Sequence, residues 1–410
     1  MKLTRKAPAL LITVSWLIYV LFYLCRVNYS VAFPYGVAEL GLDYYVMGVI
    51  AGLFALVYSL GQVVNGYIVT RKGPWLLLFA GTIVSGLANI LFGYVNNVVG
   101  FMVLWVLNGY FQSTAWVSLI RVLTVMFERE KLGGYMGFFN TSWALGSSIT
   151  WIITGYVVSV IGWRHGFIVN GLILLILGPT FVLILRRQTK YSVEVFYKRE
   201  SLANFVISKD LVKYWKPILL LAIAYLLTTG VLQTAIVYLP SYLYTISRST
   251  AVSSLIASIY PMAGALGMII YGFALDRFRG IEKVKPLLLS IPLTAAILYV
   301  FPVLAGHNMV YAGIALAAIG LLIYGMNAQL ITTVPSALIG KKIIPLSIGI
   351  INAMGSFGSF ILNTTTGYLV DLYGFNPVFL YWSLWIILIA PSLLTLLYIY
   401  KRSNGVGEAR

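Results

Sequence analysis

Long apolar stretches alternate with short polar breaks along nearly the whole of this 410-residue chain. A helix needs about 20 predominantly apolar residues to cross the hydrocarbon core of a bilayer. Breaks at charged residues and at Gly/Pro clusters divide the chain into twelve such stretches. We predict spanning helices at 9–33, 46–69, 76–96, 99–126, 134–160, 165–185, 217–244, 251–275, 286–305, 310–335, 345–371 and 376–398.

Composition supports a membrane protein. Hydrophobic residues make up 60% of the chain and charged residues only 10%, whereas soluble proteins carry about 25% charged residues. Eleven acidic and 28 basic residues are too few to cover the surface of a water-soluble molecule of this size. The composition therefore excludes soluble enzymes, coiled coils and disordered proteins, and leaves a protein embedded in the bilayer.

The basic residues set the orientation of the twelve spans. Of the 28, only Arg164 and Arg248 fall in predicted outer loops and only Arg26 and Arg121 in spans, so the remaining 24 lie in segments predicted to be cytoplasmic. The net charge of +17 is therefore expected at the inner membrane surface rather than on nucleic acid. This distribution predicts a multi-pass cell-membrane protein with both termini in the cytoplasm.

The N-terminal apolar stretch and the central polar stretch complete the domain plan. The first stretch runs past Phe33 without a small-residue cleavage site, so we interpret it as an uncleaved first span. Cys25 is the single cysteine, which excludes an intramolecular disulfide. We predict an N-terminal six-helix bundle (1–185), a cytoplasmic linker (186–216) and a C-terminal six-helix bundle (217–410).

The two halves repeat each other at an offset of 212 residues. The stretch Asn140-Thr-Ser-Trp-Ala-Leu-Gly-Ser-Ser followed by Gly155-Tyr-Val-Val-Ser-Val-Ile-Gly162 matches Asn352-Ala-Met-Gly-Ser-Phe-Gly-Ser-Phe followed by Gly367-Tyr-Leu-Val-Asp-Leu-Tyr-Gly374. A second match pairs Gly66-Tyr-Ile-Val-Thr-Arg71-Lys-Gly73 with Gly272-Phe-Ala-Leu-Asp276-Arg277-Phe-Arg-Gly280. Internal repeats of this length indicate two structurally similar halves.

The second match resembles the loop signature of the major facilitator superfamily. That resemblance implies an all-α membrane protein with twelve helices in two pseudo-symmetric six-helix bundles, working by alternating access. It also implies structural or gating roles for Arg71, Asp276 and Arg277, although Thr70 replaces the usual Asp of the first copy. We expect a structural role for Arg121 as well, because it lies near Glu128 and the cytoplasmic end of its span.

Motifs for ATP hydrolysis and metal chemistry are missing from the sequence. There is no phosphate-binding Gly-rich loop with a Lys and no His/Cys cluster, and His165 and His307 both fall in predicted outer loops. We therefore expect no cofactor, no bound metal and no enzymatic activity. The expected partners are a small anionic solute and the lipid bilayer, without nucleic acid, and the expected state is a monomer.

Arg26 lies inside the first predicted span, 20 residues after Lys6 and 13 before Glu39. A charge at the bilayer centre costs about 2.5–3.5 kcal/mol on insertion scales. All eleven acidic residues can be placed away from mid-depth, with Glu39 and Asp43 outside and Asp371 at the outer end of its span. Arg26 must therefore face water, carbonyl oxygens, aromatic rings or a bound anion, and an ionisable residue inside the membrane favours the bound anion.

Polar and aromatic residues recur at helical spacing on several spans. Tyr19, Tyr23, Arg26 and Ser30 form such a stripe on the first span, and tyrosines can both stack on a guanidinium and hydrogen-bond a ligand. Further candidates for the substrate site are Tyr58, Gln62, Gln112, Asn140, Trp143, Tyr225, Thr228 and Tyr324.

The sequence around Arg26 resembles a family of organophosphate:phosphate antiporters, which includes carriers of glycerol 3-phosphate and hexose phosphates. The resemblance rests on Tyr23-Leu-Cys-Arg26-Val-Asn28-Tyr-Ser-Val-Ala-Phe-Pro34, on Phe111-Gln112-Ser-Thr-Ala-Trp116 and on Gly320-Leu-Leu-Ile-Tyr324-Gly. It covers the whole chain. The first motif is also similar to that of anion:cation symporters of sugar acids.

The chain departs from that family at most charged positions. The family resemblance implies one phosphate-binding arginine in each half, and Arg26 matches the first while Thr228 stands at the second. The family's lysine, histidine and glutamate fall at Gln62, Trp143 and Pro261. A single arginine suits a monoanionic carboxylate, with which it forms one bidentate pair, better than a doubly charged phosphate ester.

We therefore predict a secondary-active or facilitative carrier of a small organic anion, either an organophosphate or a carboxylate. One alternative has the same fold but a different transport activity: proton-coupled symport of sugar acids or other organic acids, or transport of neutral sugars. The other alternative is a sensor that binds a solute without transporting it.

Overall fold

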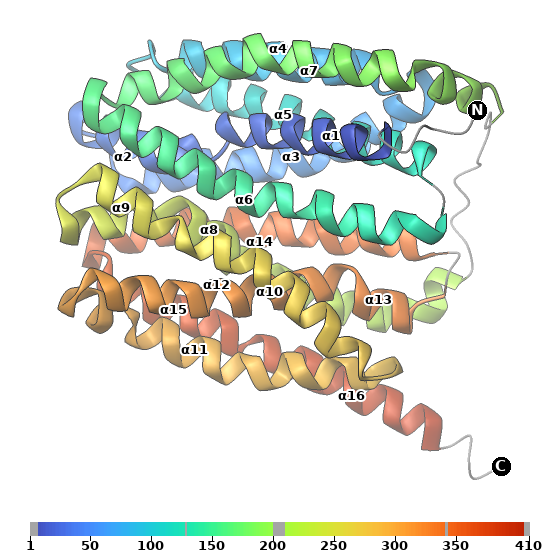
Figure 1. The fold of residues 1–410 in the computed structure, drawn as a ribbon. Coiled ribbons are helices and arrows are strands. Elements are labelled where there is room, and N and C mark those ends of the chain that lie inside the picture. The colour runs from blue at the N-terminus through green and yellow to red at the C-terminus, as the bar shows by residue number, and fades with distance from the viewer. Residues whose placement is uncertain (1–6, 128, 200–209, 341–342, 406–410) are drawn as a thin grey trace. The chain divides into compact units, whose positions relative to one another are not determined.

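The computed structural model describes residues 7–127, 129–199, 210–340 and 343–405. Within these residues every regular element is a helix (Figure 1). The elements are α1 (Ala7–Leu24), α2 (Asn28–Leu40), α3 (Tyr44–Lys72), α4 (Trp75–Phe92), α5 (Val98–Met126), α6 (Arg129–Ile161), α7 (Trp163–Arg199), α8 (Asp210–Ser247), α9 (Thr250–Ala257), α10 (Ile259–Asp276), the 3-10 helix η1 (Gly280–Lys283), α11 (Val284–His307), α12 (Met309–Ile331), α13 (Thr333–Leu338), α14 (Ile344–Tyr373), α15 (Asn376–Ile387) and α16 (Ile389–Gly405).

Twelve segments of the described chain are long and apolar enough to cross a membrane, as the apolar pattern predicts. Five of these segments contain two helical elements. The first, Ala9–Leu40, contains α1 and α2. The eighth contains α9 and α10, the ninth η1 and α11, the tenth α12 and α13, and the twelfth α15 and α16. The first span also continues to Leu40, beyond the predicted end at residue 33.

Contacts between Cα atoms divide the chain into two units. Unit 1 comprises Met1–Leu42, Leu53–Phe205 and Arg248–Ser258, and unit 2 comprises Asp43–Gly52, Val206–Ser247 and Ile259–Arg410. In unit 1, α4 packs on α5 and α7, and α6 packs on α1 and α9. In unit 2, α10 packs on α12 and α8 packs on α14. The predicted bundles at 1–185 and 217–410 remain predictions, since the units are not contiguous in sequence.

Small residues allow the helices to approach closely inside each unit. In unit 2, a Cβ at Gly320 would collide with the backbone carbonyl of Tyr260, and one at Gly267 would collide with that of Leu321. In unit 1, a Cβ at Gly171 would lie 2.7 Å from the carbonyl oxygen of Gly86. Helix packing through small residues is typical of membrane proteins, where burial of apolar side chains against lipid provides little driving force.

The glycines of the internal repeat follow helices at matching places. Gly162 and Gly374 follow α6 and α14 with φ of 91° and 74°, and Gly73 and Gly280 have φ of 83° and 50°. Positive φ at the end of a helix favours glycine because a Cβ would clash there. The repeated sequence therefore places glycines with positive φ at matching positions of the two halves.

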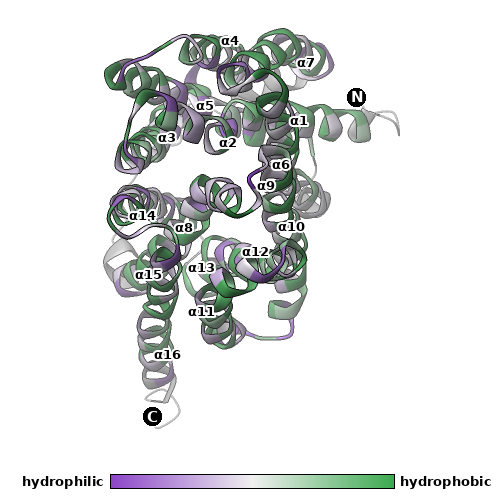
Figure 2. Ribbon diagram, turned by 90° about the vertical axis from the view of Figure 1, so that its left-hand side faces the viewer, coloured by the Kyte–Doolittle hydropathy of each residue, from purple (hydrophilic) through white to green (hydrophobic). Residues whose placement is uncertain are grey.

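Large apolar side chains remain exposed on many helices. Leu289 exposes 77% of its surface and Phe273 exposes 72%. Figure 2 shows the hydrophobic colour along much of α11 and α16. A soluble protein rarely leaves so much apolar surface in contiguous patches, whereas a lipid-facing surface requires it.

The predicted linker begins as a continuation of a spanning helix. Helix α7 runs without a break to Arg199, and α8 begins at Asp210. The part of the linker between these helices lies outside the described residues.

Candidate functional site

The first span of unit 1 is interrupted at Cys25, Arg26 and Val27, which we call the interrupted turn. The N–H of Arg26 and that of Val27 both donate to the carbonyl of Tyr23, each at 3.0 Å. The N–H of Ser30 then donates to the carbonyl of Val27 at 3.2 Å. The helical hydrogen-bond pattern therefore lapses at the residue that carries the positive charge.

Side-chain amides from two other helices bind the carbonyls around the interrupted turn. The carbonyl of Cys25 accepts from Nδ2 of Asn108 at 2.7 Å and from Nδ2 of Asn89 at 3.0 Å. The carbonyl of Phe22 accepts from Nε2 of Gln112 at 2.9 Å. Asn28 donates to Oδ1 of Asn89 at 2.8 Å. Backbone polar groups released from a helix inside a membrane must find partners in the protein, and these amides supply them.

The guanidinium of Arg26 lies among three aromatic rings. Its Cζ is 4.4 Å from the ring centroid of Tyr58, 5.2 Å from that of Tyr23 and 5.4 Å from that of Phe54. Arg26 is half-buried and, within the described residues, forms no ion pair with a carboxylate. Aromatic faces attract a cation through their quadrupole. The guanidinium has five N–H donors, and its contact with the Tyr58 side chain does not use them all.

Tyrosine hydroxyls continue this cluster toward α3. The hydroxyls of Tyr19 and Tyr58 are 3.4 Å apart, and Nε2 of Gln62 donates to the hydroxyl of Tyr58 at 3.1 Å. The ring of Tyr19 packs against Tyr23 with centroids 5.4 Å apart and against Trp116 with centroids 5.2 Å apart. The structure therefore brings together five of the predicted site residues, namely Tyr19, Tyr23, Arg26, Tyr58 and Gln62.

Ser30 does not continue the predicted stripe beside Arg26. The side chain of Ser30 is buried. It accepts from Nε1 of Trp151 at 2.7 Å and donates to the carbonyl of Val27 at 2.8 Å. Ser30 therefore connects the start of α2 to α6.

Three further candidates of unit 1 lie on α5 and α6. Gln112 is buried, and its Nε2 donates a hydrogen bond to the carbonyl of Phe22. Asn140 and Trp143 on α6 are half-buried. One turn beyond Trp143, a Cβ at Gly146 would lie 3.1 Å from Cβ of Tyr23, so α6 passes close to the Arg26 cluster.

The candidates of unit 2 are buried and uncharged. Thr228, which stands where the family resemblance implies a second arginine, donates its hydroxyl to the carbonyl of Ala224 at 2.7 Å. Tyr225 packs against Gly355, and Tyr324 forms an edge contact with Tyr260 at 5.2 Å between centroids. These contacts are within unit 2 and give it tyrosine rings and hydroxyls without a guanidinium.

The residues of the signature turns lie at helix ends. The guanidinium of Arg71 is exposed and lies 5.2 Å from the ring centroid of Tyr67, and Thr70 donates to the carbonyl of Gly66 at 2.9 Å. Asp276 and Arg277 are exposed at the end of α10, and Asp276 lies 3.9 Å from Nζ of Lys283. Arg121 is half-buried on α5. Their gating roles remain predictions.

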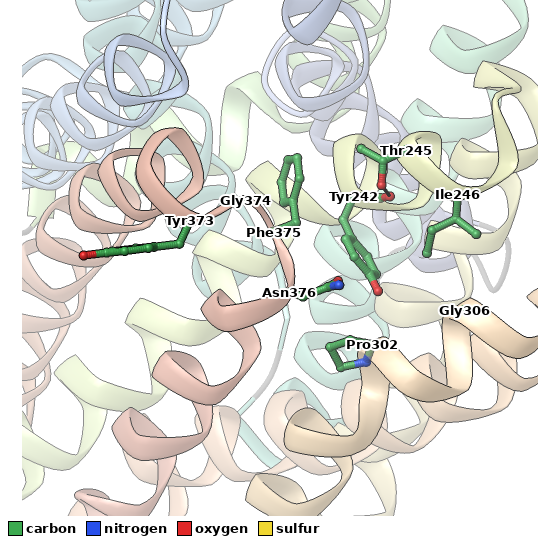
Figure 3. Close-up of a pocket in the computed structure, with 9 residues that line it drawn as sticks. All are labelled: Tyr242, Thr245, Ile246, Pro302, Gly306, Tyr373, Gly374, Phe375 and Asn376. Carbon is green, nitrogen blue, oxygen red and sulfur yellow. Dashed lines mark hydrogen bonds between the residues drawn. The ribbon is translucent and has the colours of Figure 1, made fainter.

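Unit 2 also contains a cavity of about 370 Å³ that the sequence did not suggest. It lies where α8 and α11 end and α14 turns into α15, and its lining residues are Tyr242, Thr245, Ile246, Pro302, Gly306, Tyr373, Gly374, Phe375 and Asn376. Figure 3 shows Tyr242, Asn376 and Pro302 close together, whereas Tyr373 points away from them. None of these nine residues is charged, so this cavity does not match the predicted anion site.

Sequence reasoning missed two contributors to the Arg26 cluster. Phe54 lies under the guanidinium, but a phenylalanine inside an apolar helix gives no signal. Asn89 binds the carbonyl of Cys25. An asparagine in the predominantly apolar segment Trp75–Phe92 was a usable signal, because polar residues in spans often hydrogen-bond to another helix.

The profile of the Major Facilitator Superfamily matches residues 15–362. A probable hexose phosphate transport protein of Chlamydia muridarum is 31% identical over 191 residues, which are 45% of this chain and 41% of that protein. Another, from Chlamydia pneumoniae, is 25% identical over 393 residues, 88% of this chain and 85% of that protein. The membrane sensor protein UhpC of Escherichia coli is 32% identical over 163 residues, 40% of this chain and 37% of that protein.

These matches confirm the resemblance drawn from the motifs around Arg26, although two of the three alignments cover only about two-fifths of the relative's length. Among solved structures, a bacterial homologue of the human lysosomal transporter Spinster matches with a TM-score of 0.73 at 13% identity. That alignment covers 96% of this chain and 97% of the other. At this identity the likeness confirms the twelve-helix fold.

Proposed function

This chain belongs to the Major Facilitator Superfamily and is a multi-pass membrane protein, and on that premise we propose that it carries a small organic anion across the membrane by alternating access. The observation that carries the proposal is Arg26, a half-buried cation in the middle of a span, surrounded by aromatic rings and unpaired with any carboxylate of the described residues. A permanent charge in that setting suits a ligand of opposite charge.

The names of the relatives favour an organophosphate as the anion. Two of them are described as hexose phosphate transport proteins, and another relative, from Bacillus subtilis, as a glycerol-3-phosphate transporter. A carboxylate remains the second substrate class because this chain offers one arginine, with Thr228 at the other expected position. A neutral sugar is not favoured, since it would leave the guanidinium without a counter-charge.

The first test is a thermal-shift screen of the purified protein with glycerol 3-phosphate, glucose 6-phosphate, gluconate and glucose. We expect stabilisation by the anions and none by glucose, because only ligands that bind the folded state raise the unfolding temperature. Stabilisation by glucose alone would contradict the proposal. Counterflow of a labelled anion in proteoliposomes then separates a carrier from a binding protein.

A second candidate function is solute sensing without transport, which is supported by the similarity to a protein named as a membrane sensor. A sensor would bind the anion in the thermal-shift screen but would give no counterflow. Counterflow with the same purified protein therefore distinguishes a carrier from a sensor.

Exchange of anions is the proposed form of energy coupling. A proton-coupled carrier needs a titratable group in its pathway, usually Asp, Glu or His. The two acids nearest the predicted outer mouth already have partners: Glu39 accepts from Trp163 at 2.7 Å and from Arg164 at 2.9 Å, and Asp371 accepts two backbone N–H groups of α3. Arginine stays protonated throughout the physiological range, so Arg26 cannot replace them.

The expected setting is the cell membrane, with both termini in the cytoplasm, and a monomer without enzymatic activity. The distribution of basic residues supports this orientation. Fusion of an alkaline phosphatase reporter to the C-terminus tests it, because that reporter is active only outside the cytoplasm. We expect an inactive fusion.

A further inference from the structure

The carbonyl oxygen of Cys25 accepts two side-chain amides that come from different helices. Asn108 on α5 donates at 2.7 Å and Asn89 on α4 donates at 3.0 Å. Both asparagines are fully buried, and Cys25 immediately precedes Arg26 in the chain. Arg26 therefore follows directly on a peptide group whose carbonyl is hydrogen-bonded by side chains of α4 and α5.

The interruption has no local cause in the sequence. Residues 22–28 are Phe-Tyr-Leu-Cys-Arg-Val-Asn, without Pro or Gly, and such a sequence would otherwise continue as a helix. In a continuous helix the carbonyl of Cys25 would accept the N–H of residue 29. The amides of Asn89 and Asn108 replace that partner, so they stabilise the interrupted form over the straight helix.

The irregular hydrogen bonds of this turn involve Arg26 itself. Its N–H donates to the carbonyl of Tyr23, three residues earlier, at 3.0 Å, whereas in a continuous helix the acceptor would be the carbonyl of Phe22, four residues earlier. A return to the regular pattern would therefore shift the backbone that carries the guanidinium. The distance of 4.4 Å from Cζ of Arg26 to that ring centroid thus depends on the backbone conformation that the two amides stabilise.

We propose that Asn108, together with Asn89, is a positioning residue for Arg26. It acts through the carbonyl of Cys25, and it determines how well the guanidinium is aligned for an anion. The inference rests on the proposed function, since it assigns to these amides a role in the affinity of the anion site.

Simple helix packing predicts different behaviour from positioning. If the asparagines only joined helices, replacing any buried asparagine that joins two helices would lower stability without a specific effect at Arg26. Asn65 provides the matched control, because it is equally buried and donates to the hydroxyl of Ser113 on α5 at 2.8 Å rather than to a carbonyl of the interrupted turn.

The experiment compares Asn108→Leu with Asn65→Leu, which remove the same amide and introduce no charge. Two quantities are measured on each purified variant: the affinity for glycerol 3-phosphate, and the rate at which N-ethylmaleimide alkylates Cys25. Cys25 is the single cysteine of the chain and is buried in the interrupted turn, so its alkylation reports opening of that turn without an engineered probe.

We expect Asn108→Leu to weaken binding roughly tenfold, the effect of one lost buried hydrogen bond, and to accelerate alkylation of Cys25. Asn65→Leu should leave both quantities close to wild type, whatever it does to the unfolding temperature. Because Asn89 and Asn108 share one acceptor, the double variant Asn89→Leu/Asn108→Leu should weaken binding by more than the product of the two single effects. Asn108→Ser and Asn65→Ser provide a second matched pair if the leucine variants do not fold.

Equal alkylation rates in the Asn108 and Asn65 variants would overturn the inference, as would equal losses of affinity. The alkylation measurement needs no ligand. If the wild-type protein binds neither glycerol 3-phosphate nor gluconate, the proposed function fails, while the alkylation rates still decide whether Asn108 holds the turn that carries Arg26.

Discussion

One carboxylate oxygen of Asp371, on α14, accepts the backbone N–H of Tyr44, the first residue of α3, at 2.9 Å, and the other oxygen accepts that of Tyr45 at 2.7 Å. The first N–H groups of a helix lack intrahelical partners, and the positive end of the helix dipole favours an anion there. At the matching position of the first repeat, 212 residues earlier, Ser159 donates to the carbonyl of Tyr156 on its own helix. The carboxylate contact is therefore specific to the second repeat.

Asp371→Asn should destabilise the protein, because the amide can accept with only one oxygen and has no charge for the helix terminus. We expect a loss of about 1 kcal/mol, as for other charged groups at helix N-termini. The measurement is thermal unfolding in detergent, followed by tryptophan fluorescence. Ser159→Ala is the control at the repeat-related position and should change the unfolding temperature little. A larger effect of Ser159→Ala would contradict the assigned contact.

Arg26→Lys should weaken anion binding although the charge is retained. An ammonium group cannot offer the planar pair of N–H donors that a carboxylate or phosphate accepts. The loss of one or two charge-assisted hydrogen bonds corresponds to a roughly 10- to 100-fold weaker affinity, measured by titration of glycerol 3-phosphate and gluconate. Arg279→Lys, at an exposed position after α10, is the control. Wild-type affinity in both Arg26→Lys and Arg26→Gln would exclude Arg26 as the main anion contact.

Tyr58 should contribute to binding mainly through its ring. Tyr58→Phe keeps the aromatic face 4.4 Å from Arg26 and loses the hydroxyl, which contacts Tyr19, Gln62 and the Arg26 side chain. Tyr58→Leu removes the face, so the anion must order a freer guanidinium at a cost of about 0.5–1.5 kcal/mol. We expect near wild-type affinity for the first variant and a weakening of roughly 2- to 12-fold for the second. The reverse order would assign the role to the hydroxyl.

Transport should require an exchangeable anion and no proton gradient. Proteoliposomes preloaded with unlabelled glycerol 3-phosphate should take up the labelled compound, whereas liposomes with a pH gradient and no internal anion should not accumulate it. Glu39 and Asp371 already accept hydrogen bonds with both of their oxygens, which leaves them poorly suited to carry protons through the cycle. Accumulation that collapses on addition of a protonophore would overturn exchange in favour of proton-coupled symport.

Most residues of the Arg26 cluster could be predicted from the sequence, but their positions relative to one another could not. Arg26 stood out because a charge in a span is costly, and the tyrosines on its own helix followed from helical spacing. Tyr58 and Gln62 were found by the same spacing on another span. The short distance between Tyr58 and Arg26 depends on how α3 lies against α1. The residue pattern within either helix does not specify that arrangement.

The twelve spans and the internal repeat, with its recurring glycines, follow from the sequence alone. These features depend on properties of neighbouring residues, since apolar length decides what can cross a bilayer and positive φ at Gly162 and Gly374 favours the residue without a Cβ. They can be found one segment at a time.

The break of the first span at Cys25, Arg26 and Val27 depends on contacts with other helices. The donors that stabilise the break are Asn89, Asn108 and Gln112, which lie 64, 83 and 90 residues from the carbonyls they bind. The local sequence favours a continuous helix, and the packed helices α4 and α5 supply the hydrogen bonds that outweigh it. The position of the guanidinium is therefore a property of three helices together, because a backbone carbonyl in a membrane protein adopts the conformation in which it has a donor.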